Sequence, residues 1–165
     1  MFNLPTIRNH GEISEDDKES RLAIRNLIEN YTKAMQEEFG ERGEMDRVND
    51  EGLTEHFVGG AYIRQLLIPK GITMVSALWN KDRFWIISEG EVDVLTEFGK
   101  QRIKAPYYGM APFGSRVALL ALEDTMWFAI TGAKSDNSSD VEAEIIVKDH
   151  KELSYPWTKN LEDKS

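Results

Sequence analysis

Short apolar or alternating runs, separated by turn residues, fill residues 61–131 and give this part of the chain its most regular pattern. The runs that we expect to form strands are residues 61–68, 72–79, 84–88, 91–98, 101–105, 116–121 and 126–131. Glycine, proline or paired acidic residues stand between them. Short strands with turn signals at this spacing are typical of an all-β sandwich or barrel. No helical pattern lies between them, which argues against a parallel α/β sheet.

A helical periodicity precedes the strand region. Apolar residues recur at helical spacing with charged residues at most other positions, and the pattern predicts an amphipathic helix over residues 14–40. Its apolar stripe should pack either on its own domain or on another subunit. The stripe therefore supplies three candidate interface residues, Leu27, Tyr31 and Met35.

These patterns divide the chain into consecutive segments. We expect an extended arm over residues 1–13, the helix over 14–40, a polar linker over 41–57, the β-barrel over 58–133 and an acidic tail over 134–165. Within the tail, residues 138–147 predict either a short helix or a last strand, and the helix is favoured. Tyr155 and Trp157 add two candidate interface residues, since aromatic clusters in charged tails often contact the protein itself or a neighbour.

Charge and composition narrow the function classes. The 165-residue chain has a net charge of −9, made up of −7 over residues 1–60, +1 over 61–133 and −3 over 134–165. Binding to nucleic acid is not expected, because neutralising phosphates needs a surplus of Lys and Arg. No apolar run is long enough to span a membrane and no signal pattern begins the chain, so we expect a soluble protein without a membrane partner. The absence of cysteine excludes disulfides, thiolate metal sites and cysteine nucleophiles.

Residues 71–90 resemble the first sequence motif of the cupin superfamily, in which two histidines and a glutamate lie between two glycines. Gly71 and Gly90 stand at the glycine positions of this motif. Residues of other kinds occupy its metal-ligand positions, namely Ala77, Trp79 and Arg83.

Pro112-Phe113-Gly114 is similar to the turn of the second cupin motif, with Val117 at the position of its histidine. The resemblance covers roughly residues 58–131. It implies a mainly β fold, a cupin-type jelly-roll barrel, here with an N-terminal amphipathic helix and extended terminal arms.

The resemblance also implies where a metal would be held. Metal-binding cupins hold iron, manganese, zinc or nickel with the motif histidines and glutamate. Ala77, Trp79 and Val117 cannot ligate a divalent cation, and Arg83 would repel one. We therefore expect no metal, no other cofactor, no catalytic residues and no enzymatic activity.

Arginines in or beside the predicted strands suggest a different kind of site. If they point inward, Arg64, Trp79, Arg83 and Arg116 would form a ligand pocket, because guanidinium groups bind carboxylate or phosphate in bidentate fashion and a barrel mouth can hold one small ligand. Exposed strand positions or ion pairs with nearby acids are the alternative.

More narrowly, segments within residues 62–127 resemble a cupin-like family encoded mainly by tailed bacteriophages. Its members commonly keep histidines near positions 79 and 83, which here are Trp79 and Arg83. The resemblance implies a non-enzymatic structural or assembly protein of a virion, for example a head–tail, collar or tail-associated component. Other virion proteins and further copies of the chain would be its partners, first in the host cytoplasm and then in the particle.

Two other functions stay open. One is a metal-free cupin that binds a small anionic or sugar-like ligand, for instance as a counter-defence factor. The other is a sugar-phosphate epimerase or isomerase, although the histidine partner that such enzymes use with tyrosine is missing.

Overall fold

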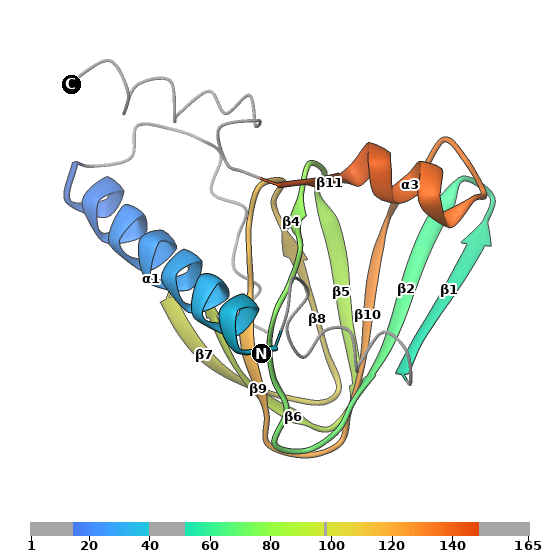
Figure 1. The fold of residues 1–165 in the computed structure, drawn as a ribbon. Coiled ribbons are helices and arrows are strands. Elements are labelled where there is room, and N and C mark those ends of the chain that lie inside the picture. The colour runs from blue at the N-terminus through green and yellow to red at the C-terminus, as the bar shows by residue number, and fades with distance from the viewer. Residues whose placement is uncertain (1–14, 40–51, 98, 149–165) are drawn as a thin grey trace.

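The structure, a computed structural model, describes residues 15–39, 52–97 and 99–148. The arm over residues 1–13, most of the expected linker, Tyr155 and Trp157 lie outside these residues. Helix α1 (Glu15–Phe39) precedes the strands, and helix α3 (Ser138–Ile145) follows all of them except the last (Figure 1). Neither helix is long and apolar enough to cross a membrane, as far as the described ranges extend.

The strands form two main antiparallel sheets. The five-stranded sheet has the order β1 (Leu53–Val58), β2 (Ala61–Ile68), β10 (Thr125–Gly132), β5 (Arg83–Glu89) and β8 (Tyr107–Ala111). The four-stranded sheet has the order β3 (Thr73–Val75), β9 (Ala118–Ala121), β6 (Glu91–Thr96) and β7 (Gly99–Lys104). A small third sheet joins β4 (Leu78–Trp79) to β11 (Ile146–Val147).

This strand order is that of a jelly roll. Most successive strands lie in opposite sheets, so that β2-β10-β5-β8 faces β3-β9-β6-β7, as two interleaved Greek keys require. Between the two main sheets no backbone pairing joins the strands that the structure describes. The mainly β jelly roll with an N-terminal helix is thus confirmed, but its sheets stay open instead of closing into a barrel.

Two strands occupy segments that the sequence did not mark as strands. β1 lies in the segment that was expected to be a polar linker. Its inward positions are Leu53, Glu55 and Phe57, and the acid among them hides the alternation of apolar and polar residues. β8 lies in an expected turn, where Pro106 and Gly109 gave a turn signal. The strands therefore begin at Leu53, five residues before the expected start of the barrel.

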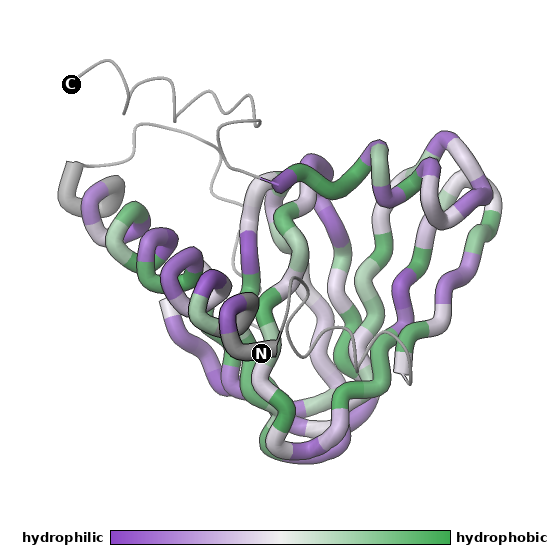
Figure 2. The backbone as a smooth tube through the Cα atoms, viewed as in Figure 1, coloured by the Kyte–Doolittle hydropathy of each residue, from purple (hydrophilic) through white to green (hydrophobic). Residues whose placement is uncertain are grey.

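The main core lies between the two sheets, and hydrophobic residues recur along the strands of both (Figure 2). A second cluster lies beneath α3, where Val141 and Ile145, both fully buried, pack with Tyr62, Trp79 and Ala129. Residues 138–147 thus form the favoured helix and then a short strand, and they belong to the packed domain and not to a solvated tail.

Helix α1 packs against its own four-stranded sheet. Ile28 is 3% exposed, and the guanidinium groups of Arg21 and Arg25 lie 2.8 and 2.7 Å from the two carboxylate oxygens of Glu97, just after β6. Leu27 instead points away, with 58% of its surface exposed. The face of α1 that meets the sheet thus includes Ile28 of the expected apolar stripe but not Leu27, because the paired charges of Arg21, Arg25 and Glu97 are buried beside Ile28. Tyr31 is half-buried, and the Met35 side chain lies outside the described part.

Candidate functional site

Arg83 and two tryptophans occupy the interior where the cupin motif places its ligands. Arg83 begins β5 and is only 3% exposed. Its Cζ atom lies 5.1 Å from the ring centre of Trp79 and 5.9 Å from that of Trp85, and its Nη2 donates a hydrogen bond to the carbonyl oxygen of Ser115 at 3.2 Å. The guanidinium group is therefore stabilised by the faces of two indole rings and by one backbone dipole.

Backbone hydrogen bonds bring the two motif segments together. The Ser76 amide donates to the Val117 carbonyl at 2.8 Å, and the Val117 amide donates to the Ser76 hydroxyl at 3.0 Å. The Phe113 amide donates to Asp82 Oδ1 at 2.7 Å. The segments that match the two motifs therefore lie side by side, as the resemblance implies.

The two motif glycines have the backbone conformations that explain their identity. Gly71 and Gly90 have φ values of 86° and 91°, in the region that side chains disfavour. A Cβ atom at Gly90 would also collide with the Asp124 carbonyl oxygen and with Thr125. Only glycine fits this turn.

The side chains at the four ligand positions do not fit a divalent cation. Ala77 packs against the cluster that contains Trp79, while Val117 is buried in the main core. Arg83 brings a positive charge to the same interior. Over residues 15–39, 52–97 and 99–148, no group of three or more His, Asp, Glu or Cys could hold a metal. The four positions themselves therefore offer a cation no ligand, and Arg83 adds a charge that repels one.

Arg64 is a second arginine on the inner face of the five-stranded sheet. It is 5% exposed and lies in register with Glu55 on β1 and Ala129 on β10. Its Nε atom is buried and has no hydrogen-bond partner in the described part of the chain. A buried guanidinium with an unused donor is a suitable group for binding an anion.

Glu55 directs its hydrogen bonds away from Arg64. Its carboxylate accepts from the hydroxyl groups of Tyr62 and Ser138, which ties β1 to β2 and to the first turn of α3. Burial, together with the hydrogen bond to Glu55, raises the pKa of the Tyr62 hydroxyl well above its usual range, while the Arg64 charge acts in the opposite direction. Tyr62 therefore stays protonated and acts as a donor.

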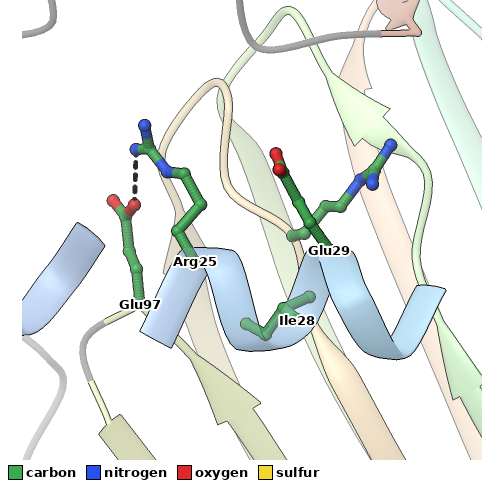
Figure 3. Close-up of a pocket in the computed structure, with 5 residues that line it drawn as sticks. Arg25, Ile28, Glu29 and Glu97 are labelled. Atoms are coloured by element: carbon green, nitrogen blue, oxygen red, sulfur yellow. Dashed lines mark hydrogen bonds and ion pairs between the residues drawn. The ribbon is translucent and has the colours of Figure 1, made fainter. Parts of the chain in front are cut away.

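The structure does not bring the four expected pocket residues together. Trp79 and Arg83 are in contact and Arg64 lies on the same inner face, but Arg116 lines a small cavity under α1. Figure 3 shows this cavity, in which the Arg25 and Glu97 side chains point toward one another. A four-residue pocket in the interior is therefore not formed.

The hydrogen-bonded group of Glu55, Tyr62 and Ser138 had no signal in the sequence. Glu55 and Ser138 are 83 positions apart, the first in an expected polar linker and the second at the start of an expected short helix. Only the alternation within residues 53–58 could have pointed to an inward-facing acid.

No protein-family model matches this sequence, and no curated protein sequence matches it. Similar solved structures include KdgF from a Halomonas species, at 16% identity, with 51% of this chain and 79% of that chain covered and a TM-score of 0.45. An RmlC-like cupin family protein with a double-stranded β-helix fold from Methanocaldococcus jannaschii has 16% identity, coverage of 49% and 78%, and a TM-score of 0.43. A cupin-2 domain containing protein from Shewanella frigidimarina has 12% identity, coverage of 50% and 80%, and a TM-score of 0.42. The chain is thus a jelly-roll protein by its own strand order, similar to cupin-domain structures over about half of its length.

Proposed function

We propose that this protein is a non-enzymatic structural or assembly component of a bacteriophage virion and acts through contacts with other proteins. The observation that carries the proposal is the contact of the Arg83 guanidinium with the rings of Trp79 and Trp85, because Trp79 and Arg83 stand at positions where the cupin motif has metal ligands. In this arrangement packed aromatic and charged groups fill the interior. The protein therefore acts through its surface. The resemblance to the phage-encoded cupin-like family is the reason for placing the protein in a virion.

In this function the chain is one of several copies in a head–tail, collar or tail-associated assembly. It forms in the host cytoplasm and is then retained in the particle. Its partners are virion proteins and other copies of itself, since a net charge of −9 does not suit nucleic acid.

Quantitative mass spectrometry of purified virions tests the proposal. Peptides of this protein should remain in a constant molar ratio to the major capsid protein through successive density-gradient steps. If the protein occurs only in the soluble fraction of infected cells, the structural function is wrong.

Arg64 favours a second function, the binding of a small anion by a metal-free cupin. Arg64 is 5% exposed, and its buried Nε atom has no hydrogen-bond partner among the described residues. Burying an unpaired charge is costly, and a bound carboxylate or phosphate would compensate it. Trp85, in register with Ala129 on the neighbouring strand, would add an aromatic wall.

We expect isothermal titration calorimetry to detect binding of inorganic phosphate or acetate to the wild-type protein if this second function is correct. Arg64→Gln should then weaken binding by about tenfold or more, because the charged donors are lost. The exposed Arg102→Gln variant is the matched control and should bind as the wild type does.

Thermal unfolding of Arg64→Met without any ligand provides an independent check. If Arg64 is only a buried structural charge, this variant should be as stable as the wild type or more stable. Stabilisation of Arg64→Met together with no heat of binding in the wild type would reject the ligand-binding function.

A further inference from the structure

The outer face of the five-stranded sheet is mostly apolar. Ile63, Ile130, Phe84 and Met110 lie in one continuous row, each in register with the next, on β2, β10, β5 and β8. Their inward-facing neighbours along each strand are buried in the core, so these side chains point away from it. The row forms an outward band of large hydrophobic groups.

A second row continues this band. Phe128 on β10 is in register with Ile86 on β5, which is in register with Tyr108 on β8. Tyr108 is 42% exposed, and its ring stacks on Phe84 with the ring centres 5.9 Å apart. None of the outward positions 54, 56 and 58, 61, 63, 65 and 67, 84, 86 and 88, 108 and 110, or 126, 128 and 130 is Asp, Glu, Lys or Arg, and Glu89, in register with Met126, lies at the end of β5. We call these positions the apolar face.

The outer face of the four-stranded sheet is different. There Arg102 forms a bidentate ion pair with Asp93 at 2.8 and 2.9 Å, and Lys104 lies 3.8 Å from Glu91 across the same two strands. Such cross-strand pairs of opposite charge are typical of a sheet face that is exposed to water. The two outer faces of one sandwich thus have opposite chemistry.

The described helices pack elsewhere. α1 contacts β6 of the other sheet, and the buried residues of α3 pack with inward-facing Tyr62 and Ala129. Contiguous exposed apolar surface of this kind marks an interaction site in soluble proteins.

We propose that the apolar face binds the apolar face of a second copy of this chain, so that two five-stranded sheets pack about a two-fold axis. The proposal deepens the proposed function by naming the surface through which the copies associate. Each copy has a net charge of −9, and two such chains repel wherever charged surfaces meet. An uncharged face is therefore the surface on which two identical acidic chains can approach closely.

The size of the face is sufficient for such a contact. Five strands about 4.8 Å apart and about six residues long cover roughly 24 by 20 Å, or about 500 Å² on each copy. Two copies together reach about 1,000 Å², the lower range for a specific interface. Face-to-face packing of two twisted sheets is also a common arrangement, with interdigitated side chains between them.

Sedimentation equilibrium of the full chain tests the proposal. The wild-type protein should be a dimer at about 100 μM, a concentration that detects even micromolar affinity. Met110→Glu should weaken dimerisation by about 100-fold or more, because two-fold symmetry places two new charges in one apolar contact. Leu27→Glu, at an exposed leucine on α1, is the matched control and should leave the dimer unchanged.

Thiol protection gives a second measurement that does not need a charged variant. The chain has no cysteine, so Met110→Cys and Leu27→Cys each carry a single thiol. The rate of labelling should fall with rising protein concentration for Met110→Cys and stay constant for Leu27→Cys.

A monomeric wild-type protein would overturn the proposal, as would dimerisation that Leu27→Glu abolishes and Met110→Glu does not. Neither result concerns the presence of the protein in virions, so the two proposals can fail separately.

Discussion

Replacing Trp79 with alanine should lower the free energy of unfolding by about 3–5 kcal/mol, the range for removing a large aromatic side chain from a core. Trp79 is 3% exposed and packs with Tyr62, Val141 and Ile145 beneath α3. It also provides a ring face for the buried Arg83 guanidinium, which the alanine variant would leave less well compensated. Urea denaturation followed by circular dichroism measures the change without depending on tryptophan fluorescence.

The control for this prediction is Leu27→Ala, since Leu27 is 58% exposed and its substitution should change stability by less than about 0.5 kcal/mol. An effect of Trp79→Ala no larger than that of the control would mean that the interior is not tightly packed around Arg83. Binding of a ligand in the interior would then become the better proposal for the function.

Replacing Glu97 with alanine should release α1 from the sheet, at a cost of about 3 kcal/mol, as expected when one partner of a buried ion pair is removed. Glu97 is the shared partner of Arg21 and Arg25, and the side chains of Arg25 and Glu97 are 9% and 8% exposed. Without the carboxylate, two cations would remain near each other at the contact with the sheet. Hydrogen exchange of the α1 backbone amides should therefore accelerate strongly, while the amides of the central strand β10 should change little.

Arg102→Ala is the matched control for the Glu97 variant. It breaks the ion pair with Asp93 on the outer face of the same sheet, where the Arg102 side chain is 62% exposed. Surface ion pairs contribute about 0–1 kcal/mol, so only a small effect is expected. If Glu97→Ala costs no more than Arg102→Ala, the buried pair does not hold the helix. A double-mutant cycle that combines Glu97→Ala with Arg25→Ala measures the interaction energy between these two side chains.

Much of the fold could be predicted from the sequence because its strands obey a local rule. Residues 61–68 alternate between core and surface, and β2 has these same bounds. β1 and β8 were not predicted because local features of the sequence hid their strand pattern. β1 has an acid at an inward position, and a proline and a glycine at β8 gave a turn signal. Whether the sheets close could not be predicted either, since closure depends on strand pairing between distant segments.

The candidate site was predicted in part. The spacing of the motif correctly placed Trp79 and Arg83 near each other, and the structure adds Trp85 to this pair. The position of Arg116 could not be derived, because it depends on where α1 packs, and the Glu97 ion pairs that help to set this packing join residues far apart in the chain. The partners of Glu55 come from segments too far apart in the chain to be paired by pattern.

The open sandwich leaves β7 as an outermost strand of the four-stranded sheet, paired on one side only among the described strands. Lys100, Arg102 and Lys104 project from the same face of this strand, with side chains 62–72% exposed. Cations on an outermost strand hinder the addition of a foreign strand. β8, at one border of the other sheet, has no charged residue in YYGMA. Fibrillar growth on prolonged storage should therefore begin at β8, whereas β7 is protected against it.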